Sequence, residues 1–141
     1  MREILFRGKA ANREDYRVYR TKYKNGDWVY GLLTAADNYL GFAEMTNTGG
    51  VQGIEVDKNT IGQFTGLTDK NGKRIFEGDI VTGLFLFGLS VKAVVTFQDG
   101  VFGLEWYRGN VKTFNAFTSI CNVEYEVIGN IHDNPELLKN E

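Results

Sequence analysis

The clearest pattern along the chain is a series of short apolar runs separated by Asn-Gly and Asp-Gly pairs, which is typical of antiparallel sheet. Ile4 and Phe6 alternate with their neighbours and predict a first strand with one apolar face. Asn25-Gly26 is a turn signal between two strand-like stretches, and therefore predicts a hairpin. Residues 34–54 are ambiguous, because their first half allows either a strand or a brief helix and their second half resembles a loop.

After residue 60 the turn signals become regular, with Asn71-Gly72, Gly78-Asp79 and Asp99-Gly100 between apolar runs. Strands are therefore predicted at residues 80–87, 91–97, 101–107, 111–117 and 123–131. Short strands joined by tight turns predict a small closed barrel or a sandwich, because closure removes unpaired strand edges. Close to the end, an asparagine able to cap a helix precedes a proline, which predicts a single helical turn at residues 134–138.

The length of 141 residues fits one domain, or two very small ones sharing a core. No stretch approaches the roughly 18 unbroken apolar residues of a membrane span, so we expect a soluble protein with no membrane contact. The N-terminus carries charges where a signal peptide needs an apolar core, and Cys121 is the only cysteine. Both observations favour the cytoplasm.

Charge is distributed unevenly along the chain. Residues 1–30 hold eight basic and four acidic side chains, a net +4, so the other residues carry −6 of the total of −2. A basic segment with aromatic residues is one way to build a nucleic-acid surface, whereas a solvated strand face explains the same residues without a ligand. The candidate contacts, to phosphates and to bases respectively, are Arg13, Arg17, Arg20, Lys22 and Lys24, with Trp28 and Tyr30.

One run is unusually apolar for a small domain. In a half-buried strand, alternation would leave every second large side chain of this run in water. A second subunit would cover it and make the protein a homo-oligomer, and burial of both strand faces within one chain is the alternative. The residues of this candidate assembly surface are Leu84, Phe85, Leu86, Phe87 and Leu89.

Candidate catalytic groups are few. Asp69, Glu77 and Asp79 lie close together in the sequence, as paired carboxylates would, but each stands at a turn where a carboxylate ordinarily caps its own backbone. Cys121 and His132 are the only residues of their types, which excludes a His/Cys metal cluster within one chain and leaves a structural role for each. No phosphate-loop pattern is present, so we expect no cofactor and no enzymatic activity.

In order and in joint presence, several segments resemble the YopX family of small proteins from phages, prophages and related mobile elements. They are residues 2–4 with 6–9, 26–31, 60–67 with 69–72, 75–81, and 126–131 with 134–138. The resemblance implies a mainly β fold, with a mixed α/β N-terminal part at residues 1–59 and a small SH3-like barrel at residues 60–141. Residues 10–24 and 84–89 depart from the family pattern. The family has no established catalytic residues to carry over.

Two functional hypotheses follow. The preferred one is a non-enzymatic phage or prophage protein that acts in the host cytoplasm, self-associates and binds an unidentified host or phage protein. The alternative is a nucleic-acid-binding accessory protein that uses the basic N-terminal segment. A hydrolase using the three carboxylates is the least favoured.

Overall fold

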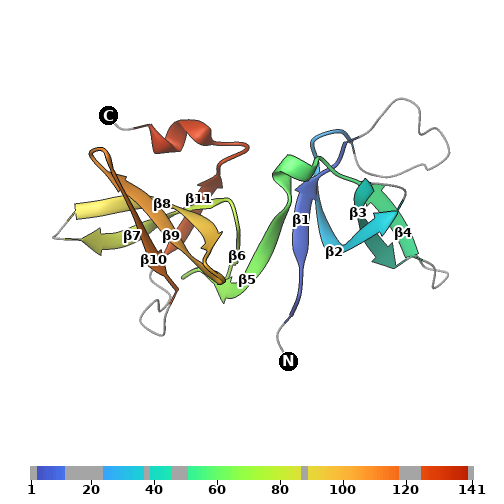
Figure 1. Ribbon diagram of the computed structural model, residues 1–141, viewed down its shortest axis with the longest axis horizontal. Helices are drawn as coiled ribbons and strands as arrows, with labels where there is room; N and C mark the ends of the chain where they lie inside the picture. Colours follow the sequence, from blue (N-terminus) through green and yellow to red (C-terminus); the bar gives the residue numbers. More distant parts are fainter. Residues whose placement is uncertain are drawn as a thin grey trace. The chain divides into compact units, whose positions relative to one another are not determined.

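The computed structural model describes residues 3–11, 24–36, 39–45, 51–86, 89–117 and 125–139 of the chain. In this part of the chain the fold is mainly β, its strands pair antiparallel, and its helices are two single 3₁₀ turns. The chain forms two compact units, Met1–Gln63 and Phe64–Glu141 (Figure 1). The division into domains after residue 59 stays a prediction.

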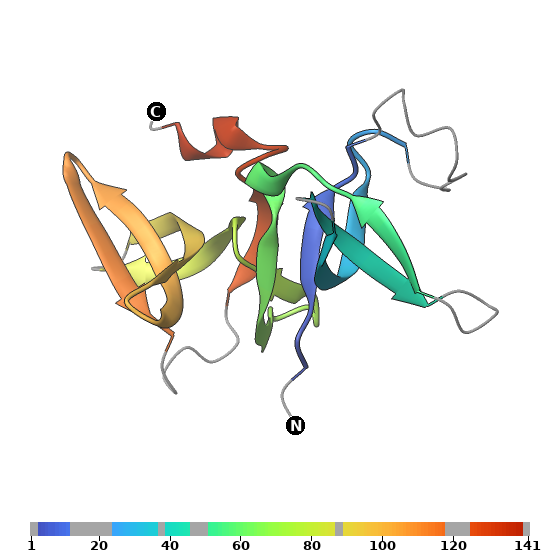
Figure 2. The same ribbon diagram turned by 45° about the vertical axis from the view of Figure 1, so that its right-hand side comes forward.

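The first unit is an antiparallel sheet with the order β4-β3-β2-β1-β5 (Figure 2). Gly8 of β1 pairs with Val29 of β2, and Phe6 pairs with both Gly31 of β2 and Gln63 of β5. The bounds of the strands and of the 3₁₀ turn η1 are β1 Phe6–Lys9, β2 Trp28–Ala36, β3 Tyr39–Met45, β4 Val51–Glu55, η1 Lys58–Thr60 and β5 Gly62–Thr68. Only the first residues of β5 belong to this unit.

The predicted α/β character of the N-terminal part is wrong. Residues 39–45, for which a helix was one alternative, form β3 between β2 and β4, with Phe42 paired to both Leu33 and Ile54. Gly41 weakens a helix by about 1 kcal/mol relative to alanine, whereas the aromatic residues around it favour a strand. The ambiguity is therefore resolved by pairing on both sides of β3.

The second unit contains a five-stranded antiparallel sheet with the order β10-β9-β8-β7-β11, preceded by the β5–β6 hairpin. Four of the five strands predicted after residue 79 match the observed strands to within a few residues. The fifth, predicted at residues 123–131, is observed at 126–130, and residues 123 and 124 lie outside the described part of the chain. The bounds are β6 Arg74–Phe76, β7 Asp79–Leu86, β8 Leu89–Gln98, β9 Val101–Arg108, β10 Val111–Ala116 and β11 Glu126–Asn130.

The predicted SH3-like barrel is also wrong, because the sheet does not close. Closure would require the two outermost strands, β10 and β11, to pair with each other, and the described residues show no such pairing. The last strand, β11, lies at one edge of the sheet beside β7, where Glu126 lies opposite Thr82 and Asn130 lies opposite Asp79. In the second unit the number and order of the strands along the chain were predicted, whereas their spatial order was not. In the first unit, β4 occupies part of a stretch that was predicted to be a loop.

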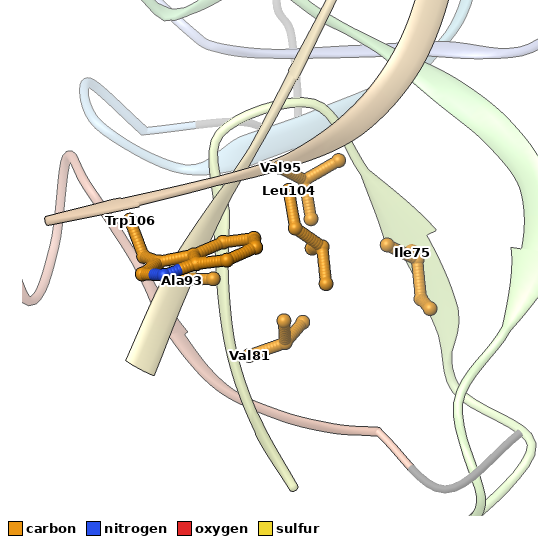
Figure 3. Packing of buried hydrophobic residues seen from close by; sticks show 6 residues of the cluster. All are labelled: Ile75, Val81, Ala93, Val95, Leu104 and Trp106. Carbon is orange, nitrogen blue, oxygen red and sulfur yellow. The ribbon is translucent and has the colours of Figure 1, made fainter. Parts of the chain in front are cut away.

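The core of the second unit lies on one face of this sheet (Figure 3). Val95 and Leu104 are cross-strand partners, and Trp106 lies two residues further along β9 on the same face. The cluster consists of Ile75, Val81, Ala93, Val95, Leu104 and Trp106. Cross-strand neighbours on one face pack together in this way because side chains alternate along each strand.

The C-terminal 3₁₀ turn η2, Pro135–Leu138, confirms the predicted helical turn. Asn134 does not cap it with its side chain; its Oδ1 accepts a hydrogen bond from the Asn130 N–H at 3.3 Å instead. A Cβ at Gly129 would come within 2.6 Å of that Oδ1 and within 2.9 Å of Leu137 Cδ1. The turn therefore packs against β11 where a glycine leaves room for it. No helix in the described part is long and apolar enough to span a membrane.

Candidate binding face

The strongest candidate site is one face of the β1–β2 pair. Cross-strand partners project to the same side of a sheet, and residues two apart along a strand do so too. Lys9 is opposite Trp28, and Arg7 is opposite Tyr30. Together with the next residue of the same row on β2, these side chains form what we call the Trp28 face: Arg7, Lys9, Trp28, Tyr30 and Leu32.

The opposite face of the same strands builds the core of the first unit. Val29 is fully buried there and Leu33 packs beside it, together with Ala10, Ile54 and Val56. Because the core is supplied by the alternate residues, the aromatic side chains of the Trp28 face are not needed to fill it. Tyr30 is 47% exposed and Leu32 is 55% exposed.

Two cations hold the indole of Trp28. The guanidinium carbon of Arg7 lies 4.6 Å from the ring centroid, and Lys9 Nζ lies 5.5 Å from it. Both distances are within the range at which a cation is attracted to an aromatic face. Arg7 is only 5% exposed, so its contact with Trp28 is largely shielded from water. This arrangement fixes the orientation of the indole.

The turn before β2 places a further basic residue at the Trp28 end of this face. Gly26 has a φ of 91°, as a tight Asn-Gly turn requires. The Lys24 N–H donates to Asp27 Oδ2 at 2.9 Å, and the Asp27 N–H donates to the Lys24 carbonyl at 3.0 Å. Lys24 itself is exposed.

The predicted nucleic-acid residues are therefore only partly brought together. Trp28 and Tyr30 share a face, and Lys24 stands in the turn leading to it. Arg7 and Lys9 complete the face but were not among the predicted contacts, although a strand pairing of β1 with β2 would have identified them. Four predicted residues lie outside the described residues: Arg13, Arg17, Arg20 and Lys22.

The predicted assembly surface lies where the structure describes the backbone but not the side chains. Leu84 pairs with Val91, and Leu86 pairs with Leu89, so the run forms the end of β7 and the start of β8. Phe87 is outside the described residues. Self-association through Leu84, Phe85, Leu86, Phe87 and Leu89 stays a prediction.

Two of the three candidate carboxylates, Asp69 and Asp79, hold turns. Asp69 Oδ1 accepts the N–H groups of Asn71 at 2.8 Å and Lys73 at 2.9 Å, and its Oδ2 accepts the Val127 N–H at 3.0 Å. Burial acts to raise the pKa of Asp69, but these three N–H groups and the charge of Lys73 outweigh it, so the pKa lies below its ordinary value of 3.8.

Asp79 and Asn130, the last residue of β11, are used in the same way. Asp79 is 1% exposed, and its Oδ2 accepts the Phe76 N–H at 2.8 Å across the turn at Gly78. Asn130 Oδ1 accepts the N–H groups of His132 at 3.0 Å and Asp133 at 2.9 Å. Among the residues that the structure describes, no group of three His, Cys, Asp or Glu side chains is arranged to hold a metal ion. Cys121 lies outside them.

The fold and these contacts define an antiparallel β protein of two units, in which carboxylate and amide side chains hold turns and Asp69 also reaches a segment far away in the sequence. A family model described as "YopX protein" matches residues 15–139, and the chain belongs to the YopX family. Three residues that hold turns, Asp69, Asp79 and Asn130, lie in the segments that carry the resemblance to this family. In this protein, these family segments therefore contribute to the fold.

Solved structures are similar as well, among them the crystal structure of protein EF1440 from Enterococcus faecalis, with 23% sequence identity and a TM-score of 0.49, covering 99% of this chain and 100% of that one. No curated protein matches the chain in sequence.

Proposed function

We propose that this YopX-family protein is a non-enzymatic binding module and that the Trp28 face is its binding surface. The observation that carries the proposal is the exposure of Tyr30 and Leu32 in one row of β2, while the alternate residues of that strand fill the core. Adjacent exposed apolar side chains on a rigid sheet are a feature of contact surfaces. Aromatic side chains with basic neighbours are favoured at binding sites, because they contribute large contact areas at little entropic cost.

The carboxylates support a non-enzymatic role. A general acid or base has to present an oxygen to the substrate. Both oxygens of Asp69 accept backbone N–H groups, and Asp79 is buried against the Phe76 N–H. The low pKa of Asp69 also makes it a poor base near neutral pH. Phage or prophage origin, action in the host cytoplasm and a host or phage macromolecule as partner belong to the same proposal.

The test is affinity capture by the full chain from a bacterial cell extract, with and without nuclease treatment. The variant carries Tyr30→Ser and Leu32→Ser, and the control carries Tyr107→Ser, which alters a tyrosine of β9 that is 60% exposed. We expect the double variant to retain at least about tenfold less of the captured macromolecule than the wild type does, and the control to retain as much as the wild type. Equal retention by all three proteins would remove the Trp28 face from the proposal.

A further inference from the structure

We infer that the Trp28 face binds single-stranded nucleic acid, with a base stacked on Tyr30 and phosphates of the backbone contacting Lys9 and Lys24. This inference rests on the proposed function and names the ligand of the same surface. It reverses the preference drawn from the sequence, because the face that the structure describes combines cations with aromatic rings.

The two aromatic residues have different roles. The indole of Trp28 already faces the guanidinium of Arg7 and lies near Lys9 Nζ. We therefore assign Trp28 as a positioning residue that keeps the two cations in place. Tyr30 is the more exposed ring, and it stands opposite Arg7 in the register. Stacking of a base on such a ring does not depend on sequence, because every base has a π-face.

The charges and the spacing fit an extended polyanion. Lys9 and Lys24 both lie towards the Trp28 end of β2, one opposite that residue and one in the preceding turn. Rows of side chains along one strand face repeat at about 6.8 Å, so Trp28, Tyr30 and Leu32 form a straight track of apolar contacts that begins beside Lys9 Nζ, 5.5 Å from the Trp28 ring. A nucleic-acid strand carries phosphates along its backbone and a base on each sugar. It therefore presents anionic groups for the lysines and aromatic rings for Tyr30.

A single strand fits better than a duplex or an acidic peptide. In a duplex the faces of the bases are stacked on one another, so Tyr30 could not reach them without unstacking. An acidic peptide would satisfy Lys9 and Lys24, but its carboxylates have no ring to place on Tyr30. The exposed tyrosine is therefore the residue that distinguishes the ligand classes.

The experiment measures fluorescence anisotropy of a labelled oligonucleotide of about 12 nucleotides, as DNA and as RNA, with the full chain between about 50 and about 200 mM salt. We expect Tyr30→Ser to weaken binding about tenfold and Tyr30→Phe to leave it nearly unchanged, since the ring is kept. Lys9→Gln should reduce the slope of log affinity against log salt concentration by about 1, which corresponds to one lost phosphate contact. Tyr107→Ser is the matched control and should bind as the wild type does. Circular dichroism checks that each variant is folded.

Absence of oligonucleotide binding at the lowest salt, or equal binding by Tyr30→Ser and the wild type, would overturn the inference. So would equal competition by a glutamate-rich peptide, since it would show a site for any polyanion. If a protein is retained through Tyr30 in nuclease-treated extract while oligonucleotides do not bind, the proposed function stands and the nucleic-acid ligand is wrong. The two failures are therefore distinguishable.

Discussion

Asp69 accepts a hydrogen bond from the backbone N–H of Val127, 58 positions later in the chain, at 3.0 Å. The other oxygen of the same carboxylate holds its own turn through the N–H groups of Asn71 and Lys73. The Lys70 N–H strengthens the connection by donating to the Tyr125 carbonyl at 2.9 Å. One buried side chain thus joins the turn before β6 to the strand β11.

Asp69→Asn should lower the free energy of unfolding by about 1–3 kcal/mol, because an amide nitrogen in place of Oδ2 would face the Val127 N–H and leave that donor unsatisfied. The other oxygen can keep its two hydrogen bonds, so the variant should still fold. Urea unfolding followed by circular dichroism measures the change. Asp99→Asn is the control: Asp99 is exposed and has a φ of 50°, which asparagine also tolerates. A loss of similar size in both variants would contradict the assignment.

Stability should fall in acid through Asp69. Its pKa is lower in the folded state than its ordinary value of 3.8. The contribution to stability is therefore fully present above that value and is lost as pH falls through the folded-state pKa. Urea unfolding of the wild type and Asp69→Asn between about pH 6 and about pH 2 should show a steeper acid loss in the wild type. Parallel pH profiles would show that other groups cause the acid sensitivity.

Gly103→Ala should destabilise the second unit by about 1–3 kcal/mol through overpacking. A Cβ there would meet the backbone oxygen of Asn115 and would lie 2.6 Å from the Phe114 ring, which leaves little room for adjustment. Gly53→Ala is the matched control in β4, where no atom lies within 4 Å of the added Cβ. The control should be neutral or slightly stabilising. Thermal unfolding of both variants provides the comparison, and equal midpoints would contradict it.

Self-association is tested by multi-angle light scattering on a size-exclusion column, for the wild type, Phe85→Asp and Phe87→Asp. If residues 84–89 form an assembly surface, the wild type should elute as an oligomer, and either charge should dissociate it because a carboxylate would be desolvated in the interface. A monomeric wild type would overturn the homo-oligomer hypothesis. Lys92→Asp is a control on the neighbouring strand β8, because Lys92 is exposed.

The sequence predicted local features well because strands and turns depend on nearby residues. Asn71-Gly72 and Asp99-Gly100 mark observed turns, and Gly72 has the expected positive φ of 81°. Spatial order depends on pairings between distant segments, which no local pattern encodes. The pairing of β11 with β7 was missed for that reason. A closed barrel was therefore predicted where the structure has an open sheet.

The candidate site was half predicted. Trp28 and Tyr30 were identified from the type and spacing of their side chains, but Arg7 and Lys9 join them only through the register of β1 with β2. Asp69 was correctly expected to hold its own turn. Its bond to Val127 could not be foreseen, because it spans two segments whose proximity is set by the whole sheet.

The two tryptophans of the chain fall one in each unit, Trp28 on a partly exposed sheet face of the first and Trp106 in the core of the second. The protein therefore contains an intrinsic optical probe for each half. A Trp106→Phe variant would emit from the first unit alone, and Trp28→Phe from the second alone. Denaturation curves from the two variants, compared with circular dichroism, would coincide if the halves melt together and separate if they melt in turn. Because β5 runs from one unit into the other, we expect the curves to coincide.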